Sequence, residues 1–304
     1  MHRLKLLAGD LDSNNVDLLF DEPMSRHTTF KIGGPADLMA VPHTPVDLQD
    51  ILSACARHGV PFFLLGNGSN LLVGDGGIEG VVIKTDTYLT RISRQGDNTL
   101  RAECGAMLTA VASTAQRQGL SGLEFSFGIP GTIGGAVCMN AGAYGGEMAD
   151  VVRSVRCFTR EGEELTLTGE ELGFGYRSSA FSGGEYIAAE VVMELLGGDT
   201  GEIRARMEEF KRQRVLKQPL EYPSAGSVFK RPEGHFAGRL IELSGLKGTR
   251  IGGAQVSEKH AGFVINRGGA TCDDVRRLIA HIQQTVLRDH GVALECEVRL
   301  VGRL

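Results

Sequence analysis

The sequence contains no apolar stretch long enough to cross a membrane. Its N-terminal segment carries an apolar run that is too short for a signal peptide. The six cysteines form no CxxC pair and no cluster with histidine, and each lies among apolar neighbours. Such residues are typical of small buried thiols in a reducing compartment. We therefore expect a cytoplasmic protein with no membrane partner.

An excess of positive charge is also missing. The chain carries 32 Lys and Arg against 37 Asp and Glu, a formal net charge of -5. This balance gives no basic surface of the kind that nucleic acids require. The segment Arg204–Lys217 is rich in cations, but Glu208, Glu209 and apolar residues at helical spacing interrupt them. The pattern indicates a solvated helix face rather than a DNA-binding one, and no nucleic-acid partner is expected.

Several motifs of nucleotide binding and catalysis are absent. No GxGxxG and no GxxxxGK[ST] occur, which excludes the usual Rossmann and P-loop phosphate sites. The eight histidines show no HExxH and no paired spacing, so a metal site is not expected. No GxSxG elbow is present either, which argues against a serine hydrolase.

Glycine, in contrast, is abundant, at 42 residues against 9 prolines and without a G-X-Y repeat. This composition indicates tight turns and close approach of the backbone to a ligand. The loop Gly66–Asn70 follows the apolar segment Val60–Leu65, and its successive N–H groups could form one concavity for a pyrophosphate. A tight turn between two strands is the alternative interpretation.

A second glycine-rich stretch runs from Gly128 to Ala136 and on through Asn140–Gly146. It has few side chains, so a flat ligand could lie directly against its backbone. A packed glycine turn is again the alternative. The passage Ser121–Gly146 shows little periodicity, and a loop of this length inside a compact domain favours a functional role.

The remaining pattern is that of an α+β protein. Apolar runs bounded by turn residues predict strands at Ala36–Val41, Val60–Leu65, Val81–Lys84, Thr99–Cys104, Val151–Phe158, Glu164–Leu167, Tyr186–Leu195, Ile251–Val256 and Gly262–Asn266. Helical spacing predicts helices over 44–59, 108–119, 203–214, 240–243 and 271–291. A terminal strand, Val292–Val301, alternates apolar and polar residues.

This order suggests three domains with a linker at Gly197–Asp199. We place a first domain at residues 1–86, to which the final strand at 292–304 could return. A second domain covers 87–197 and a third covers 198–304.

Three polar residues are candidates for chemistry, although each also has an ordinary explanation. Ser227 lies in a turn-rich segment, where a lone serine is usually a turn hydroxyl. Arg177 follows Tyr176 and could equally belong to a surface loop. Glu297 lies inside a predicted strand, where glutamate is disfavoured unless that face is wet or functional. Glu295 and Arg299 share its face, so a solvated edge strand is the simpler explanation from the strand alone.

Taken together, six segments in this order resemble the UDP-N-acetylenolpyruvoylglucosamine reductases of peptidoglycan synthesis. They extend over nearly the whole chain, from His27 to Gly302. The six segments are Thr28–Gly34, Gly66–Asn70, Gly128–Ala143, Tyr176–Ser179, Ala225–Phe229 and Glu297–Gly302. Each is weak alone, but their combination is specific.

The resemblance implies a three-domain flavoprotein with an FAD-binding fold of the vanillyl-alcohol oxidase (PCMH) type and a C-terminal α+β substrate domain. It implies FAD as cofactor and NADPH as reductant. By the same resemblance Ser227 is the proton donor, and Arg177 and Glu297 act on the substrate carboxylate. The residues implied to bind FAD are Gly66, Asn67, Gly68, Ser69, Asn70, Pro130, Gly131, Thr132, Gly134, Gly135, Asn140, Ala141 and Gly142. Those implied to contact the sugar-nucleotide substrate are Lys217, Tyr176, Tyr222 and Arg231.

One departure from the family is visible. Longer members insert a tyrosine-bearing loop after the strand that ends here near Leu196, whereas this chain has only Gly197–Asp199. The residue that clamps the substrate diphosphate is therefore open, with Tyr222 and Arg231 as candidates.

Two other functions remain open from the sequence. The chain could be another FAD oxidase or dehydrogenase of the same fold that acts on an alcohol or amine. Many such enzymes carry a flavin-linking histidine in the first loop, where this chain has Ser69 and Asn70, so a non-covalent flavin is expected. The chain could also be a non-catalytic nucleotide-binding protein.

Overall fold

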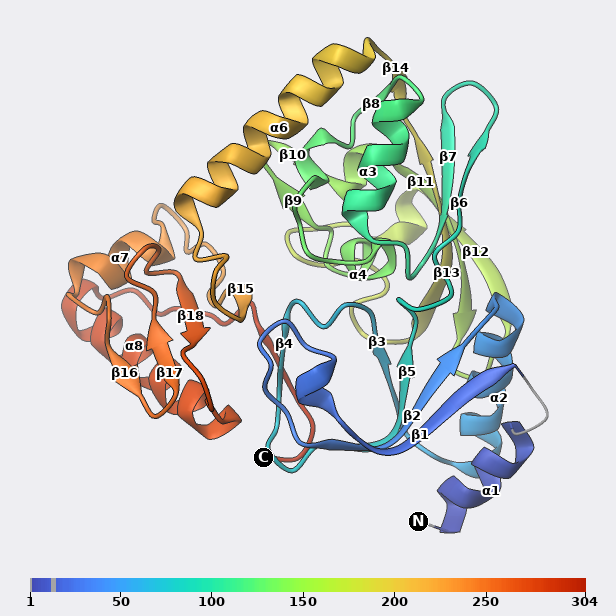
Figure 1. Ribbon diagram of the computed structural model, residues 1–304, viewed down its shortest axis with the longest axis horizontal. Helices are drawn as coiled ribbons and strands as arrows, with labels where there is room; N and C mark the ends of the chain where they lie inside the picture. The colour runs from blue at the N-terminus through green and yellow to red at the C-terminus, as the bar shows by residue number, and fades with distance from the viewer. Residues whose placement is uncertain (1, 12–14) are drawn as a thin grey trace. The chain divides into compact units, whose positions relative to one another are not determined.

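The computed structural model describes residues 2–11 and 15–304, which form two compact units (Figure 1). The first unit comprises Met1–Phe20, Leu38–Asn67 and Gly80–Gln213, and the second comprises Asp21–Asp37, Gly68–Glu79 and Arg214–Leu304. Each unit has its own apolar core. Helices and strands are mixed throughout, which confirms the predicted α+β class.

The N-terminal part contains a four-stranded sheet of order β1-β2-β5-β3. Its strands are β1 (Val16–Pro23), β2 (Pro35–Pro42), β3 (Phe62–Leu65) and β5 (Ile78–Lys84). Helix α2 (Pro45–His58) begins and ends as predicted, with Thr44 and Asp47 forming a capping box and Gly59 in the left-handed conformation at the C-terminus. Helix α1 (His2–Leu11) packs on α2 and buries three leucines.

A five-stranded antiparallel sheet of order β12-β11-β13-β7-β6 forms the larger part of the first unit. The strands are β6 (Ile92–Gln95), β7 (Thr99–Glu103), β11 (Val152–Thr159), β12 (Glu164–Thr168) and β13 (Tyr186–Glu194). One face buries Leu100, Val155 and Val191 completely. Figure 1 shows α3 (Leu108–Arg117) and α4 (Ile133–Cys138) beside this sheet.

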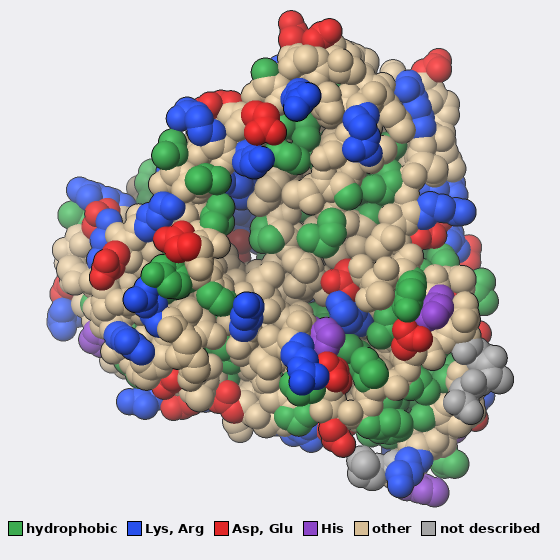
Figure 2. All heavy atoms as spheres, in the orientation of Figure 1, with side chains coloured by type: hydrophobic (Ala, Val, Ile, Leu, Met, Phe, Trp, Pro, Cys, Tyr) green, Lys and Arg blue, Asp and Glu red, His purple; other side chains and the backbone are tan. Residues whose placement is uncertain are grey.

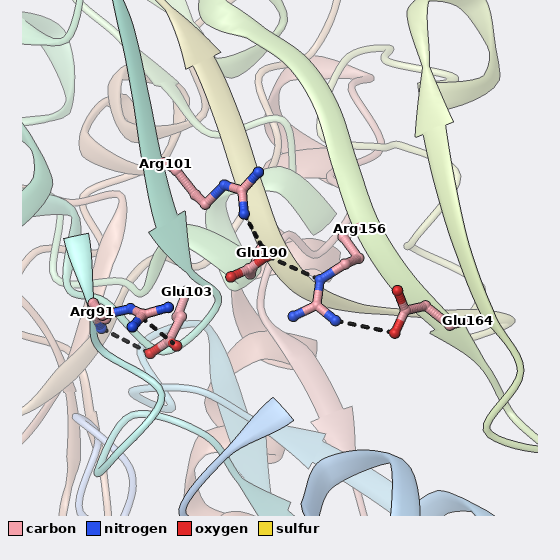
Figure 3. A network of polar contacts seen from close by, with 6 residues as sticks. All are labelled: Arg91, Arg101, Glu103, Arg156, Glu164 and Glu190. Atoms are coloured by element: carbon pink, nitrogen blue, oxygen red, sulfur yellow. Dashed lines mark hydrogen bonds and ion pairs between the residues drawn. The ribbon is translucent and has the colours of Figure 1, made fainter. Parts of the chain in front are cut away.

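The other face of the sheet carries a network of charges (Figure 3). Glu190 on β13 lies directly opposite Glu103 on β7, a pairing of like charges that destabilises a sheet when nothing compensates it. Arginines supply the compensation. Arg156 and Arg101 contact the Glu190 carboxylate at 2.9 and 3.5 Å, and the backbone N–H of Arg91 donates to Glu103 at 2.9 Å.

The prediction that Ser121–Gly146 lacks regular structure is wrong. The passage contains α4, a turn of 3₁₀ helix at Glu124–Ser126 and the short strands β9 (Gly142–Ala143) and β10 (Gly146–Glu147). Helix α5 (Met148–Val151) follows at once. Sequence patterns missed α4 because two of its six residues are glycines, which are poor helix formers.

The segment predicted as a linker is firmly bound within the first unit. Strand β14 (Leu196–Gly197) pairs with β8 (Leu120–Ser121), and the Asp199 carboxylate accepts N–H groups at the start of α6 (Thr200–Lys217). The last of the points at which the chain passes from the first unit to the second comes later, between Gln213 and Arg214. Most charged side chains of α6 are exposed, as predicted for a solvated helix face.

The second unit is built on a sheet of order β15-β18-β17-β16. Its strands are β15 (Ser224–Ser227), β16 (Arg250–Ile251), β17 (Ala254–Val256) and β18 (Phe263–Asn266), and α7 (Ala237–Leu243) lies between β15 and β16 in the chain. Helix α8 (Cys272–His290) has the predicted cap at Thr271 and ends at Gly291. It buries its apolar stripe of Val275, Leu278, Ile282 and Val286.

The predicted terminal strand Val292–Val301 is correct only at its end. Strand β19 (Arg299–Val301) pairs in parallel with β4 (Leu71–Val73). The residues before β19 form hydrogen bonds with a different segment, around Val228–Lys230. Lys230 donates its N–H to Glu295, and Glu297 donates its N–H to Val228. The segment therefore changes partners along its length, so one continuous ladder does not form.

Among the described residues, no helix is long and apolar enough to cross a membrane. The six cysteines are thiols; four are buried, as predicted, but Cys138 and Cys296 are only partly buried. On the face drawn in Figure 2, lysines and arginines are interspersed with acidic side chains.

Candidate functional site

The first glycine loop begins where β3 ends at Leu65. In the first unit, the Asn67 side-chain amide donates to the Pro130 carbonyl oxygen at 2.6 Å. A Cβ on Gly66 would lie 2.5 Å from Thr132 Oγ1. Residues from the two predicted cofactor loops, 63 positions apart in the chain, are therefore in direct contact.

The second glycine loop is held against the end of β7 and the start of α3. Leu108 donates its N–H to the Gly131 carbonyl oxygen at 2.9 Å, and Gly134 donates to Cys104 at 2.8 Å. The buried Thr132 caps α4 by accepting the Gly135 N–H. A Cβ on Gly134 would lie 2.9 Å from that of Cys104, so a larger residue could not pack as closely there.

Arg177 is fixed by this second loop. Asn140 is almost fully buried; its side chain donates to the Gly175 carbonyl oxygen and accepts the Ala149 N–H, both at 3.0 Å. Both terminal nitrogens of Arg177 lie 3.5 Å from the Gly142 carbonyl oxygen. Arg177 also has a φ of 54°, a conformation that costs free energy in a residue other than glycine. Such strain is common in residues placed for function.

Ser227 and Glu297 are brought together in the second unit. The Glu297 and Val298 N–H groups both donate to the Val228 carbonyl oxygen, at 2.8 and 3.3 Å, so Glu297 lies beside the residue that follows Ser227. The Ser227 hydroxyl donates to the Phe229 carbonyl oxygen at 3.2 Å. Two of the three predicted catalytic residues thus lie on hydrogen-bonded neighbouring segments.

The segment that carries Glu297 is also joined to the end of the first glycine loop. The Asn70 side-chain amide donates to the Glu297 carbonyl oxygen at 3.1 Å, and Arg299 donates its N–H to the Asn70 carbonyl oxygen at 3.0 Å. The end of the predicted FAD loop therefore fixes the backbone at Glu297.

A histidine that the sequence does not mark lies near Ser227. A Cβ on Gly262 would lie 3.2 Å from His260 Nδ1 and 3.5 Å from Ser227 Oγ. His260 Nδ1 accepts the Gly262 N–H at 3.1 Å, so the proton of the neutral ring is on Nε2. Burial lowers the pKa of His260, which favours this neutral form. No motif in the sequence marks this position.

The predicted substrate-binding residues fall into two groups. Lys217 ends α6, Tyr222 lies under the Arg267 guanidinium, and Arg231 lies over the Phe236 ring; these three belong to the second unit. Tyr176 belongs to the first unit, where it is exposed and contacts Arg177. Within the described part of the chain, no cluster of His, Cys, Asp and Glu could hold a metal ion.

Comparison with known proteins identifies both parts of the chain. Residues 36–168 match the model of an FAD binding domain, and residues 218–301 match that of the UDP-N-acetylenolpyruvoylglucosamine reductase C-terminal domain. These regions contain both glycine loops and the segments of Ser227 and Glu297.

Similar proteins cover nearly the whole chain. The UDP-N-acetylenolpyruvoylglucosamine reductase of Clostridium botulinum (strain Okra) is 50% identical over 96% of this chain and 95% of its own length. That of Clostridium perfringens (strain SM101) is 51% identical over 95% of both.

Solved structures agree with this assignment. The crystal structure of UDP-N-acetylenolpyruvylglucosamine reductase from Thermus caldophilus superimposes with a TM-score of 0.79 at 37% identity, covering 94% of this chain and 98% of that one. A berberine bridge enzyme variant shares only the fold, with a TM-score of 0.50 at 16% identity over 66% of this chain and 44% of its own. With half of its residues identical to curated members over almost its full length, the chain belongs to the UDP-N-acetylenolpyruvoylglucosamine reductase family.

Proposed function

We propose that this protein reduces UDP-N-acetylglucosamine enolpyruvate to UDP-N-acetylmuramate, with NADPH as reductant and FAD as bound cofactor, in the synthesis of peptidoglycan precursors. The structural observation that carries the proposal is the joining of three segments in the second unit. Asn70 of the first glycine loop, the Glu297 backbone and the Ser227 segment are connected by consecutive hydrogen bonds. This arrangement suits a flavin-dependent reduction of a substrate that also has to receive a proton.

The residues of the two loops fit FAD. Gly66 and Asn67 contact Thr132 and Pro130, and in this proposal the backbone N–H groups of the first loop meet the anionic pyrophosphate. The predicted set of thirteen FAD-binding residues is retained as part of this proposal. When bound, FAD supplies the transfer of hydride from NADPH to the terminal carbon of the enolpyruvyl group.

The protein's own residues manage the charge that then develops on the neighbouring carbon and its carboxylate. Arg177 can grip a carboxylate through two N–H groups of its planar guanidinium. Glu297, when protonated, can donate a hydrogen bond to the developing charge. The Ser227 hydroxyl gives its proton to the carbon that carries the carboxylate. Serine is a weak acid in water, but it can donate to a strongly basic carbanion held against it.

Other residues bind the nucleotide part of the substrate in this proposal. Lys217, Tyr222 and Arg231 offer two cations and one aromatic ring on the second unit, and Tyr176 offers an exposed ring on the first. We keep the functional division into an FAD domain at 1–86, a second FAD domain at 87–197 and a substrate domain at 198–304. We place the reaction in the cytoplasm, because the thiol state of the cysteines suits a reducing compartment.

Anaerobic stopped-flow spectroscopy tests the proposal. NADPH should bleach the flavin absorbance of the purified protein, and the enolpyruvyl sugar nucleotide should then restore it without oxygen. Restoration by oxygen alone, with no effect of the sugar nucleotide, would favour an oxidase. A colourless protein that binds no added FAD would contradict any flavin-dependent function.

A further inference from the structure

The segment Thr28–Gly34 is one of the motifs that the sequence shares with the family, yet the proposed reaction gives it no role. It folds as a tight turn in the second unit. The Thr28 carbonyl oxygen accepts the Lys31 N–H at 3.1 Å, and the Thr28 hydroxyl donates to the Ile32 carbonyl oxygen at 3.1 Å. Phe30 and Ile32 are buried in the core. Thr29 is therefore held on a fixed piece of backbone.

Thr29 makes two hydrogen bonds to segments far away in the sequence. Its N–H donates to the Gly68 carbonyl oxygen at 3.3 Å, and its hydroxyl donates to the Ser224 carbonyl oxygen at 2.7 Å. Gly68 is packed so tightly against His27 and Thr28 that a Cβ there would collide with their backbone. One residue thus joins the predicted FAD loop to the strand that carries Ser227.

That strand needs an external anchor because it is irregular. Ser224 pairs with Ile265 and Ser227 pairs with Phe263, so β15 has one residue more than β18 between the two pairs. Gly226 has a φ of 76°, and a bulge of this kind directs the next side chain away from the regular ladder. Beyond the bulge, Val228 donates its N–H to Gly262 at 2.9 Å. The hydrogen bond from the Thr29 hydroxyl to the Ser224 carbonyl oxygen fixes the strand on the other side of the bulge.

We propose that Thr29 is a positioning residue for the proton donor. Its hydroxyl fixes where the bulged strand begins, and its N–H ties that point to Gly68 of the first glycine loop, so that the Ser227 hydroxyl is held at a defined position relative to Gly68. This inference rests on the proposed function. A misplacement of about 1 Å in a reacting group can cost about 100-fold in rate, so one hydrogen bond at this point has a large effect.

Thr29→Val tests the inference, because it removes the hydroxyl and keeps the N–H and the branched shape. In the holoenzyme, NADPH should reduce the flavin at the wild-type rate, whereas reoxidation by the enolpyruvyl substrate should slow by about tenfold or more. The solvent deuterium isotope effect on reoxidation should rise, because proton delivery becomes slower. Amide hydrogen exchange should increase in a peptide covering residues 224–229. Thr29→Ser keeps the hydroxyl and should restore all three.

Thr271→Val is the matched control. It also removes a threonine hydroxyl from the second unit, at the cap of α8, and should lower stability without changing either half-reaction. Equal slowing of both half-reactions by Thr29→Val, or no slowing at all, would overturn the inference. Should Thr29→Val lose its flavin, Thr29→Cys retains a weaker donor and should slow reoxidation alone; unchanged reoxidation in that variant would also overturn it. The proposed function itself fails separately, if wild-type protein is not reoxidised by the substrate.

Discussion

The two units hold their functional residues in different ways. In the first unit, Arg177 depends on side chains: its guanidinium contacts the Gly142 carbonyl oxygen, and the buried amide of Asn140 fixes the neighbouring backbone at Gly175. In the second unit, the segments of Ser227 and Glu297 are joined mainly by backbone hydrogen bonds. The second arrangement lets the chemistry of a side chain be removed without disturbing the fold. In the first unit, the side chains that support the fold also hold Arg177, so substitutions there should change activity and stability together.

The largest effect is expected for Ser227→Ala, which should lose activity without losing stability. Reoxidation of the reduced flavin by substrate should slow by about 10²- to 10⁴-fold, the usual contribution of a positioned proton donor. Flavin reduction by NADPH and the melting temperature should stay at wild-type values, because among the described residues the Ser227 hydroxyl makes a single hydrogen bond, to a carbonyl oxygen two residues away. Single-turnover kinetics and thermal unfolding measure the two effects. A large drop in melting temperature would show that this side chain also holds the fold.

Asn140→Ala should reduce both stability and activity. The change leaves the Gly175 carbonyl and the Ala149 N–H without their buried partner and places alanine at a φ of 40°. We expect a loss of about 3 kcal/mol in the free energy of unfolding, together with slower substrate reduction because the Arg177 segment shifts. Urea unfolding and steady-state kinetics check this. Gln49→Ala is the control, since it removes an amide-to-carbonyl bond elsewhere in the first unit and should leave kinetics unchanged.

Glu190→Gln separates stability from activity within the first unit. Glu190 is buried between Arg101 and Arg156, so loss of its charge should destabilise the sheet by about 1.5–3 kcal/mol, with normal kinetics. Glu164→Gln removes an exposed partner of Arg156 from the same network and should cost less than about 0.5 kcal/mol. Urea unfolding of the two variants tests the difference, and equal losses would show that burial of Glu190 is unimportant.

The smallest effect concerns acid stability in the second unit. Hydrogen bonds from the backbone N–H groups of Gly253 and then Thr271 hold the pKa of Asp274 below its ordinary value of 3.8. The resulting stabilisation is fully present above pH 3.8 and is lost as pH falls through the lower pKa of the folded state. Asp274→Asn should therefore flatten the acid side of the stability curve between these values. An unchanged slope in unfolding experiments at several pH values would contradict this.

Much of the fold was predictable because local signals agreed with the final packing. Helices α2 and α8 have a threonine cap, an apolar stripe and a terminal glycine, and both occur where these signals place them. The two glycine loops were also recognisable by composition. Helix α4 was missed because burial and the Thr132 cap outweigh the poor helix propensity of its glycines.

The site was predictable only as a set of residue types. Resemblance to the family points to Ser227, Arg177 and Glu297, but no local pattern shows that Glu297 lies beside Val228, about 70 positions away. His260 carried no signal because its place near Ser227 depends on the pairing of β15 with β18. Contacts of this kind are set by tertiary structure and leave no periodicity in the sequence.

The parallel pairing of β4 with β19 has a consequence for biosynthesis. The first unit is complete once residue 213 has been made, so it can fold on the ribosome while the remainder is still being translated. Phe30, Ile32 and Leu72 are synthesised early, but their core partners lie in the last third of the chain. These apolar side chains stay without their native core partners until that last third has been translated.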